Sequence, residues 1–343
     1  MANKNTLRIG ILGAANIARL FIQDVRPSAK VQIHAVASRD VERARAFARE
    51  TGIARVHGSY EALLADPEID AVYNPLPNNL HAEWSIRAVD ARKHVLCEKP
   101  LAVSARDAER MFEAAKRNAV YLVEGYPYRS QPQTLKLRDL LAESAVGRIH
   151  TVHASFGFPL TGTTNIRLDP QLGGGALMDA GSYPVSLVRM IAGERPTRVQ
   201  STARWAETGV DRTLAGTLEF ASGLLAQITC SFATARNRRA FIVGDAGTLF
   251  TTYLNDTSPE MPPVLEITRG TGWDAKRERI ETEATSGFLA EAEAFADLVA
   301  HGMAHWPGAT PVESIDILLA LDALAQSARQ GIAVEVTVSA GQT

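Results

Sequence analysis

The sequence predicts an α/β protein: a doubly wound parallel sheet in the N-terminal part, then an α+β domain with an open, mostly antiparallel sheet. In the N-terminal part, short apolar runs alternate with segments that repeat apolar residues at helical spacing, which is typical of strand, helix and strand units. Farther along, strand-like runs follow one another with only turn signals between them, which indicates antiparallel pairing. The chain has 343 residues, more than one hydrophobic core usually serves, so we expect two domains.

Strands and helices alternate up to Glu124, where we place the boundary between a domain of residues 1–124 and one of residues 125–343. Asp40 precedes the second helix, and its carboxylate can cap that helix by accepting a hydrogen bond from a first-turn amide. The predicted strands cover residues 7–12, 31–37, 71–74, 94–97 and 120–124, and the predicted helices cover residues 17–21, 41–48, 60–65, 81–91 and 105–117.

The second domain should carry an open sheet with one face that needs cover. An exposed apolar patch of that size usually marks an interface, so we expect a homodimer or homotetramer that associates through this sheet. Its predicted strands are residues 150–158, 197–205, 213–220, 224–231, 239–243 and 248–252 with a short terminal strand, and its predicted helices are residues 134–141, 181–192, 287–300 and 312–330.

Composition and charge exclude several classes of protein. Hydrophobic residues make up 46%, charged residues 22% and the formal net charge is -2, which argues against long disorder and against a nucleic-acid-binding surface. No run approaches the roughly 20 apolar residues of a membrane helix, and residues 1–8 do not resemble a signal peptide. Cys97 and Cys230 lack metal-ligand spacing. We expect a cytoplasmic protein without a metal site or a membrane partner, and Cys97 as a core residue.

The turn after the first predicted strand fits the G-x-G-x-x-G/A frame of dinucleotide-binding proteins, with Gly13, Ala15 and Ala18 at its three small positions. A phosphate would then lie on the amides at the start of the following helix, where the helix dipole favours negative charge. The alternative is that small residues simply follow a buried strand, as in many doubly wound proteins. The residues assigned to this contact are Gly13, Ala14, Ala15, Asn16 and Ile17.

The end of the second predicted strand indicates which dinucleotide is bound. A carboxylate there would grip the ribose hydroxyls of NAD, but the chain has Ser38 and Arg39, with Arg43 one helical turn later. A hydroxyl and two guanidinium groups suit a 2′-phosphate, so we predict NADP, with NAD possible. In the alternative, both arginines are solvated charges on a helix and Asp40 binds the ribose.

Three later motifs complete a family resemblance. They are residues 74–81 (Asn-Pro-Leu-Pro-Asn-Asn-Leu-His), Glu98-Lys99-Pro100, and residues 173–183 (Gly-Gly-Gly-Ala-Leu-Met-Asp-Ala-Gly-Ser-Tyr). With the opening turn, their order and spacing resemble the glucose-fructose oxidoreductase, inositol dehydrogenase and rhizopine-catabolism (Gfo/Idh/MocA) superfamily over most of the chain. The resemblance implies an N-terminal Rossmann domain and a second domain for substrate binding and oligomerisation.

The resemblance also implies which residues lie near the nicotinamide. For His81, capping of the following helix is an equal alternative, and Pro100 is expected to follow a cis peptide bond that helps to aim Lys99. The residues that match the family's cofactor motifs here are Asn74, Pro75, Leu76, Asn79, His81, Glu98 and Lys99.

Tyr183 and Ser186 occupy positions where many members of the superfamily carry His and Asp. This departure resembles the branch with glucose-fructose oxidoreductase, dimeric dihydrodiol dehydrogenase and xylose dehydrogenase, and it argues against inositol dehydrogenase activity. Moving a hydride to or from an alcohol carbon requires a group that takes or returns the hydroxyl proton. A tyrosine can serve when a nearby ammonium lowers its pKa from about 10.

We therefore predict Tyr183 as the acid/base, Lys99 as its electrostatic partner and Asp179 as the group that orients the substrate. Taken singly, each has a plainer interpretation: Lys99 as a surface charge, Asp179 as a carboxylate at a helix start, and Tyr183 as a core residue. Polar and aromatic residues near the domain boundary and the glycines are the predicted sugar contacts, namely Tyr126, Tyr128, Arg129, Asn165 and Arg167.

The function predicted from these residues is an NADP-dependent oxidoreductase that acts on a carbinol or carbonyl carbon of an aldose or related polyol. An aldose-aldose oxidoreductase with tightly bound NADP(H) and a dihydrodiol dehydrogenase are alternatives within this chemistry. A nicotinamide-sensing regulator and a glycosidase that uses the nicotinamide transiently are alternatives outside it.

Overall fold

The computed structural model describes residues 6–162 and 165–337, and it divides the chain into two compact units. Each unit is assembled from segments that are far apart in the sequence. The first unit comprises Met1–Ala102, Asp107–Gln131 and Thr285–Pro311, and the second comprises Val103–Arg106, Pro132–Ala284 and Val312–Thr343.

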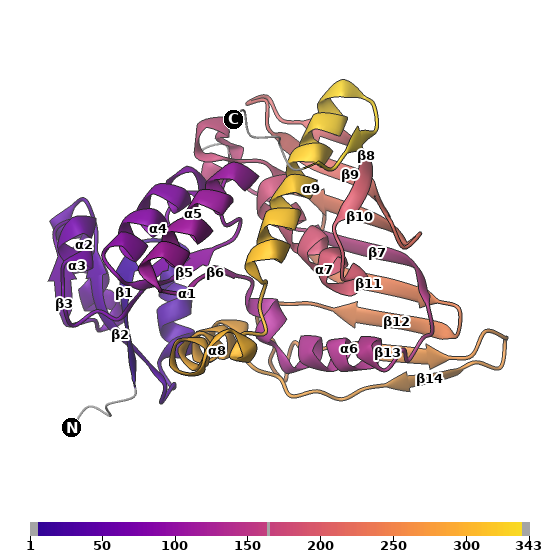
Figure 1. Cartoon of the computed structure of the whole chain (residues 1–343), viewed down its shortest axis with the longest axis horizontal. Coiled ribbons are helices and arrows are strands. Elements are labelled where there is room, and N and C mark those ends of the chain that lie inside the picture. Colours follow the sequence, from indigo (N-terminus) through magenta and orange to yellow (C-terminus); the bar gives the residue numbers. More distant parts are fainter. Residues whose placement is uncertain (1–5, 163–164, 338–343) are drawn as a thin grey trace. The chain divides into compact units, whose positions relative to one another are not determined.

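A parallel sheet forms the centre of the first unit. Among the described residues it has six strands in the order β3-β2-β1-β4-β5-β6, which confirms the predicted doubly wound sheet (Figure 1). The short β3 was not predicted because Arg-Val-His offers no apolar run. The strands are β1 (Leu7–Leu12), β2 (Val31–Ala37), β3 (Arg55–His57), β4 (Ala71–Asn74), β5 (His94–Glu98) and β6 (Leu122–Gly125).

Helices cover both faces of this sheet. On one face Phe21 stacks on Tyr73, with ring centroids 4.0 Å apart, and meets the edge of Phe288 at 6.0 Å. On the other face Tyr60 and Trp84 pack edge to face at 4.7 Å. The helices of this unit are α1 (Asn16–Val25), α2 (Val41–Thr51), α3 (Tyr60–Leu64), α4 (His81–Asp90), α5 (Ala105–Asn118) and α8 (Gly287–His301).

Helix α8 belongs to the first unit, although we expected it in the second domain. Its start is tied to α1 because Ser286 donates a hydrogen bond of 2.7 Å to Asp24. Farther along, Asp297 forms an ion pair with Lys30, and Phe295 is fully buried in the core of this unit. Such contacts join residues more than 250 positions apart, which a reading of local pattern cannot detect. The two compact units therefore differ from two consecutive domains divided at Glu124.

The second unit is built on a mixed, mostly antiparallel sheet, as predicted. Its nine strands within the described residues run in the order β14-β13-β12-β11-β7-β10-β9-β8-β15, and only β7 and β10 pair in parallel. The strands β13 and β14 were not predicted. The strands are β7 (Ile149–Gly157), β8 (Pro196–Trp205), β9 (Asp211–Phe220), β10 (Leu225–Ser231), β11 (Asn237–Gly244), β12 (Gly247–Thr252), β13 (Leu265–Arg269), β14 (Lys276–Arg279) and β15 (Val334–Glu335).

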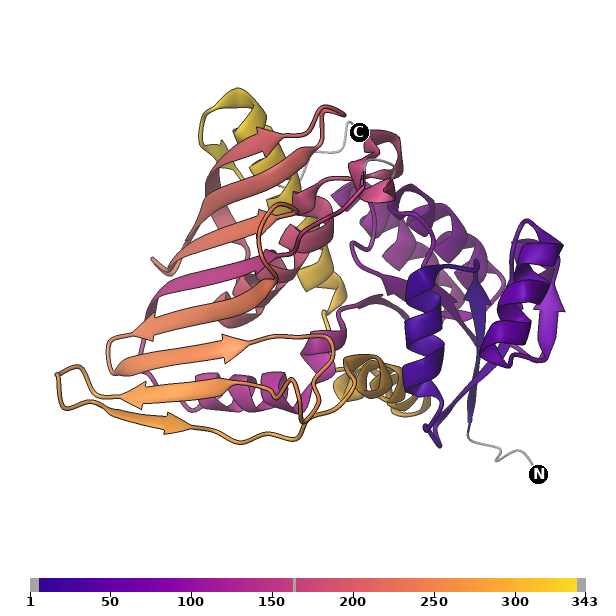
Figure 2. The same cartoon turned by 180° about the vertical axis from the view of Figure 1, so that it is seen from behind.

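The helices of the second unit lie on one face of this sheet. They are α6 (Pro132–Ala142), α7 (Ser182–Ala192) and α9 (Pro311–Gln330), as Figure 1 shows. Figure 2 shows the opposite face without helices. Along β10 the side chains alternate accordingly, because Ala226 and Ile228 are buried whereas Leu225 and Gln227 are exposed. One face of the sheet is therefore open.

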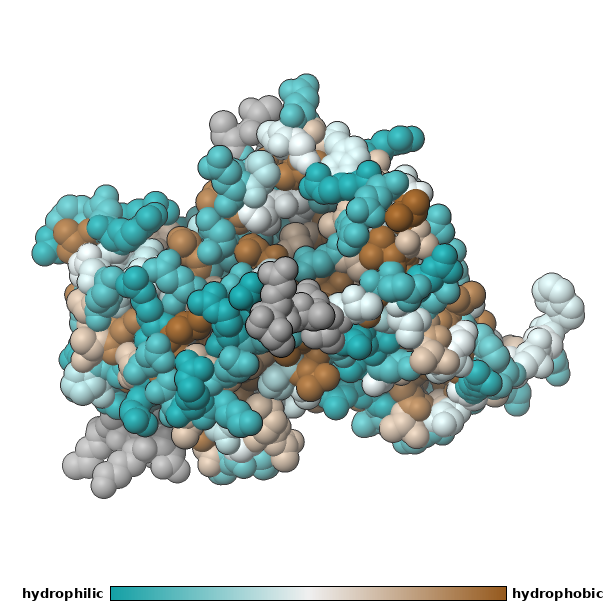
Figure 3. Space-filling view, turned by 45° about the horizontal axis from the view of Figure 1, so that its top comes forward, coloured by the Kyte–Doolittle hydropathy of each residue, from teal (hydrophilic) through white to brown (hydrophobic). Residues whose placement is uncertain are grey.

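Among residues 6–162 and 165–337, no helix combines the length and the apolar character that crossing a bilayer requires. Figure 3 shows hydrophilic and hydrophobic residues intermixed on the face of the molecule that it displays.

A buried ion pair connects α7 to α9. The Nε atom of Arg189 lies 2.8 Å from Oδ2 of Asp316, and both side chains are at most 10% exposed. Arg195 approaches the other carboxylate oxygen at 3.6 Å. Because α7 also carries Tyr183, this pair helps to hold the helix on which a predicted catalytic residue lies.

Replacing Arg189 with Met should lower the free energy of unfolding by about 2 to 3 kcal/mol, because Asp316 would stay buried without its main cationic partner. Urea denaturation of the purified variant measures this change. Arg198→Met is the matched control: its ion pair with Glu219 is half exposed, and its loss should cost less than about 1 kcal/mol. Equal effects of the two substitutions would contradict the prediction.

Candidate active site

The turn after β1 has the geometry of a phosphate-binding loop. Gly13 has a φ of +86°, and a Cβ atom at this position would lie 3.0 Å from Leu76, so the turn favours glycine for both reasons. Helix α1 begins directly afterwards, and its N-cap residue, Ala15, makes no side-chain hydrogen bond to the first turn. The cap residue therefore leaves the first-turn amides of α1 to another acceptor, such as an anion.

Both predicted phosphate-binding arginines lie beside this turn. Arg43 donates a hydrogen bond of 3.2 Å to the carbonyl of Ala14. Arg39 hydrogen-bonds to the hydroxyl of Tyr60, which lies 3.5 Å from the position that a Cβ atom of Gly13 would occupy. Burial raises the pKa of Tyr60, although the two arginines oppose the shift. Tyr60 was not identified from the sequence, because it occurs in a separate helix with no motif around it.

Asp40 caps α2, as predicted. Its Oδ1 atom accepts hydrogen bonds from the amides of Glu42 and Arg43, at 2.9 and 3.1 Å. Ser38 is buried just before it and accepts a hydrogen bond from the amide of Asp40. Because one oxygen of Asp40 is committed to the helix while both arginines border the turn, this geometry favours the interpretation with a 2′-phosphate.

The loop after β4 is braced by buried polar contacts. Asn74 donates hydrogen bonds to the carbonyl of His81 and to Ser85, at 3.2 and 3.0 Å. The two ring nitrogens of His81 lie 2.8 Å from the carbonyl oxygen of Pro100 and 2.7 Å from that of Leu76. His81 therefore links the loop of residues 74–81 to the segment that follows Lys99.

His81 does not cap α4, so that alternative is wrong. The N-cap residue of α4 is Leu80, without a side-chain cap, and the imidazole is only 1% exposed. Burial lowers the pKa of His81 to about 4; the two carbonyl acceptors oppose this shift, and the Lys99 ammonium adds to it. The ring is thus neutral near pH 7 and donates only one of its two close contacts. The Lys99-Pro100 peptide bond is cis, as predicted.

Buried carboxyl groups lie behind the Glu-Lys-Pro motif. Glu98 accepts a hydrogen bond of 2.6 Å from the hydroxyl of Tyr73. Glu291, on α8, is buried next to β6, where a Cβ atom on Gly125 would lie 3.4 Å from its Oε2 atom. Burial raises the pKa of Glu291 well above its ordinary value, and the charges of Glu98 and Glu124 raise it further. Burial and the neighbouring carboxylates therefore both favour the protonated form of Glu291. Sequence analysis missed it because α8 reaches this site from a distant part of the chain.

Tyr126, Tyr128 and Arg129 are interior residues of the first unit. Each is at most 1% exposed, and the rings of Tyr126 and Tyr128 meet edge to face at 6.1 Å. They lie in or next to the short helix η2 (Pro127–Ser130), which packs against α8. Their contact with a sugar stays a prediction, because packing explains their positions equally well.

In the second unit, Tyr183 lies near the start of α7 in a polar and aromatic environment. Its hydroxyl accepts a hydrogen bond of 2.8 Å from Asn255, and the guanidinium carbon of Arg238 lies 3.8 Å from its ring centroid. Phe156 meets the ring edge to face at 5.2 Å. Tyr183 is 4% exposed, so it is a core residue by burial, but its hydroxyl is part of a hydrogen-bond network. Neither Asn255 nor Arg238 was identified from the sequence.

Three predicted substrate residues lie together in the second unit. Asp179 accepts a hydrogen bond of 2.6 Å from Nε of Arg167. Asn165 accepts a hydrogen bond from the amide of Arg167 and caps the short helix η3 (Ile166–Leu168). Asp179 lies four residues before Tyr183, and its carboxylate is thus oriented by the guanidinium of Arg167.

The helix that carries these residues starts earlier than predicted. A π-helical turn, η5 (Leu177–Gly181), precedes α7, whereas we expected the helix to begin at Gly181. The buried carboxylate of Asp211, on β9, accepts a hydrogen bond of 2.7 Å from the amide of Leu177. Gly175 allows this approach, because a Cβ atom there would lie 2.4 Å from Asp211. A cap that comes from another strand leaves no local signal in the sequence.

The predicted site residues divide between the two units. The cofactor residues and Lys99 belong to the first unit, and Asp179 and Tyr183 belong to the second. Both cysteines are buried thiols without a disulfide bond. Within the described part of the chain, no group of three or more His, Cys, Asp or Glu side chains is arranged to hold a metal ion.

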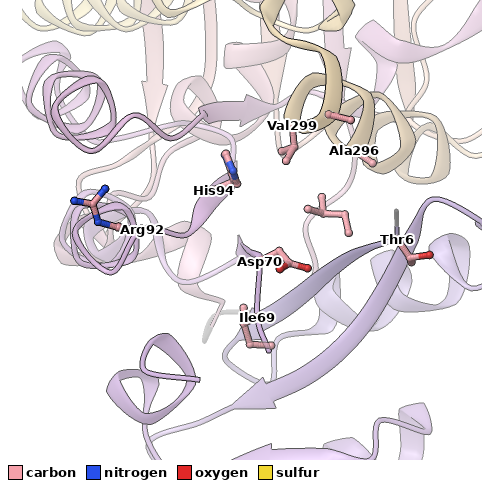
Figure 4. A pocket seen from close by; sticks show the side chains of 9 residues that line it. Thr6, Ile69, Asp70, Arg92, His94, Ala296 and Val299 are labelled. Carbon is pink, nitrogen blue, oxygen red and sulfur yellow. The ribbon is translucent and has the colours of Figure 1, made fainter. Parts of the chain in front are cut away.

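A pocket in the first unit lies at the amino-terminal ends of the parallel strands. Figure 4 shows it among Thr6, Ile69, Asp70 and His94, with Ala296 and Val299 on α8. The flanking strands begin at this edge, whereas Gly13, Ser38 and Lys99 follow the ends of their strands. Ligands of doubly wound sheets bind at the carboxyl ends of the strands, so this pocket is separate from the candidate dinucleotide site.

Comparison with known proteins assigns both parts of the chain. A family described as "Oxidoreductase family, NAD-binding Rossmann fold" matches residues 7–126. A second, described as "GFO/IDH/MocA C-terminal domain", matches residues 134–250. A D-xylose 1-dehydrogenase (NADP(+)) from Haloferax volcanii is 38% identical over 96% of this chain and 100% of its own length. The chain belongs to the Gfo/Idh/MocA oxidoreductase family.

Other relatives of this Gfo/Idh/MocA protein act on different substrates. A trans-1,2-dihydrobenzene-1,2-diol dehydrogenase from Danio rerio is 39% identical over 71% of this chain and 73% of its own. The solved structure of a 3-ketoreductase from Actinomadura kijaniata, in complex with NADP and TDP-benzene, has a TM-score of 0.83 at 30% identity and covers 94% of this chain and 98% of its own. An aldose-aldose oxidoreductase from Caulobacter crescentus, complexed with glycerol, has a TM-score of 0.87 at 25% identity, with 96% and 99% covered.

Membership confirms the resemblance found in the sequence and the fold class. The protein is an NAD(P)-dependent oxidoreductase with a Rossmann domain, and its relatives include sugar dehydrogenases. The dinucleotide turn, the two arginines and Lys99 all lie in the part of the chain that matches the NAD-binding family.

Replacing both Arg39 and Arg43 with Ala should weaken NADP+ binding about 10- to 100-fold, because one or two charge-assisted hydrogen bonds to the 2′-phosphate would be lost. NAD+ binding should change by less than about 3-fold, since NAD+ lacks that phosphate. Isothermal titration with both cofactors measures the ratio, and Arg45→Ala on the exposed side of α2 is the control. A parallel loss for both cofactors would refute the assignment.

Proposed function

We propose that this protein is an NADP-dependent dehydrogenase that transfers a hydride between the nicotinamide and a carbinol or carbonyl carbon of an aldose or related polyol. The observation that carries the proposal is the environment of Tyr183. Its phenol hydroxyl is held by an amide donor and its ring lies under a guanidinium group, one turn after the oriented carboxylate of Asp179. Such surroundings suit a phenol that exchanges a proton with a substrate hydroxyl.

The residues of the first unit fit NADP. The positive φ of Gly13 and the first-turn amides of α1 suit a pyrophosphate, and Arg39 and Arg43 suit a 2′-phosphate. The braced loop of residues 74–81 and Glu98 would border the nicotinamide and its ribose. When bound, the nicotinamide supplies the acceptor or donor of the hydride.

Three side chains provide proton transfer, charge stabilisation and substrate orientation in the proposed reaction. As an alcohol is oxidised, Tyr183 takes the hydroxyl proton, and in reduction it returns the proton to the carbonyl oxygen. The ammonium of Lys99 favours the ionised phenol and polarises the reacting oxygen. Asp179 accepts a hydrogen bond from a substrate hydroxyl and so orients the reacting carbon, while Arg167 holds the carboxylate in place.

Relatives support the choice of a tyrosine and a lysine. Structures of the Actinomadura kijaniata reductase include one variant with a tyrosine changed to phenylalanine and another with a lysine changed to alanine. Those two positions are separated by the same number of residues as Lys99 and Tyr183 in this chain. This agreement in spacing supports paired roles for the two residues here.

The substrate class follows the relative that matches the full chain. D-xylose and other aldoses are the first candidates, since the Haloferax volcanii relative is named for that sugar. A trans-dihydrodiol is the second candidate, because relatives from several vertebrates carry that name. Assays with aldoses and dihydrodiols, each with NADP+ and NAD+, distinguish the two. Protein that retains NADP(H) through purification and interconverts two aldoses would favour an aldose-aldose oxidoreductase.

Replacing Tyr183 with Phe should reduce kcat for the aldose by about 100- to 10,000-fold, because the acid/base is lost while the ring remains. Binding of NADP+ should not change, since the cofactor residues lie in the other unit. Steady-state kinetics and cofactor titration measure both effects. Tyr121→Phe, just before β6, is the control and should keep full turnover. Unchanged turnover in the Tyr183 variant would overturn the proposed acid/base.

The open sheet face is the proposed subunit interface. Phe241 and Leu225, on β11 and β10, are 41% and 49% exposed there, and the helices of the second unit leave this face uncovered. Burying these side chains against a second copy would remove apolar surface from water. The cytoplasmic location expected from the sequence stays a prediction.

A double change of Phe241 and Leu225 to Asp should convert a dimer or tetramer into a monomer, because charge would then be buried at the interface. Light scattering after size-exclusion chromatography at micromolar protein measures the mass. Leu20→Asp, on an equally exposed apolar residue of α1, should leave the mass unchanged. A wild-type protein with the mass of one chain would rule out the proposed interface.

A further inference from the structure

We infer that Arg238 and Asn255 set the acidity of the Tyr183 phenol, so that the second unit supplies part of the charge stabilisation that the acid/base needs. This inference rests on the proposed function, in which Tyr183 exchanges the proton of the reacting hydroxyl. It adds two positioning residues that the sequence motifs do not include.

The first observation is the hydrogen-bond chain. Arg238 donates to the Oδ1 atom of Asn255 at 2.9 Å, and the Nδ2 atom of Asn255 donates to the hydroxyl of Tyr183 at 2.8 Å. A guanidinium can only donate, so it fixes the orientation of the amide, and the amide must present its NH2 group to the phenol oxygen. A donor that points at this oxygen stabilises the phenolate more than the phenol.

The second observation is the position of the cation. The guanidinium carbon of Arg238 lies 3.8 Å from the ring centroid of Tyr183, and the rings of Phe156 and Tyr253 lie 4.7 and 5.1 Å away. The arginine is 8% exposed, so solvent screens its charge only weakly. Arginine stays protonated at any pH that the enzyme meets. The positive charge beside the phenol is therefore permanent.

The aromatic rings hold this cation in place. Arg238 on β11 pairs across the sheet with Phe156 on β7, and Phe156 packs edge to face against Tyr183. The hydroxyl of Tyr253 donates a hydrogen bond of 2.8 Å to the carbonyl of Ser155. Three rings and one amide thus fix a planar group that could otherwise adopt many rotamers.

Three titratable groups near the start of α7 have a partner or are neutral. Asp179 is paired with Arg167, and Asp211 accepts a hydrogen bond from the amide of Leu177. Burial raises the pKa of Cys230 well above its ordinary value, so that thiol is uncharged. Arg238 is a cation of this unit that lies directly against the ring of Tyr183.

Arg238→Met removes the charge and keeps an apolar side chain among the rings. The pKa of the Tyr183 phenol should rise by about 1 to 2 units, because an opposite charge at this distance is lost. NMR of protein labelled with 13C at the tyrosine Cζ atoms measures that ionisation directly, without a substrate, and the signal missing from Tyr183→Phe assigns the resonance. In the oxidation direction, kcat/KM increases with pH as the phenol ionises, and the midpoint of this increase should shift to higher pH by the same amount.

The controls separate charge from packing. Arg239→Met removes the same charge from the next residue of β11, which points to the opposite face of the sheet and is exposed, so it should leave the Tyr183 titration unchanged. Arg238→Lys keeps a cation at this position, so the phenol pKa should stay close to its value in the unsubstituted protein. Asn255→Leu removes only the amide donor and should raise the phenol pKa by a smaller amount, which tests the network if Arg238→Met does not fold.

The outcomes distinguish this inference from the proposed function. An unshifted Tyr183 titration in folded Arg238→Met and Asn255→Leu overturns the role of the network, even if Tyr183→Phe is inactive. An active Tyr183→Phe overturns the acid/base itself, whatever the titrations show. A loss of turnover in Arg238→Met with an unmoved pH profile would show a purely structural arginine and would also overturn the inference.

Discussion

The parallel pairing of the first sheet is the constraint on which the cofactor site depends. Parallel strands all end at one edge, so the residues that follow β1, β2, β4 and β5 come together there although long segments separate them. Gly13, Ser38, Asn74 and Lys99 each stand at or just beyond the end of one of these strands. A phosphate turn, an arginine pair, a braced loop and an ammonium therefore share one edge without any direct link along the chain.

The second unit depends on a different device, which is polar contact between its sheet and one helix. Asp211 on β9 accepts a hydrogen bond from the start of η5, and Arg238 on β11 contacts the ring of Tyr183. Both side chains lie on the face of the sheet that the helices cover. The ion pair of Arg189 with Asp316 holds the other end of the helix against α9. The orientation of the phenol is thus set by strands that follow it in the sequence. A shift of the sheet would therefore reorient the proposed catalytic group.

Family membership and site geometry answer different questions about this enzyme. Membership shows that it is an NAD(P)-dependent oxidoreductase with sugar dehydrogenases among its relatives. The geometry supports the proposed role of a buried phenol with a guanidinium and an amide beside it, and it places Arg43 next to the turn where the proposed 2′-phosphate contact would form. Related proteins share the scaffold while their named substrates range from xylose to a dihydrodiol, so the choice of substrate rests on side chains around the site.

The sequence alone determined the fold class and most of the strands and helices, because these follow from local periodicity, and a motif within a single loop predicted the cofactor turn. The cap by Asp40 was equally local. Only the tertiary structure decided that α8 packs with the first unit, that Glu291 is buried behind Glu98, and that Arg238 and Asn255 surround Tyr183. Each of these contacts joins residues from distant segments, and their energies come from burial and charge that arise only when the chain has folded.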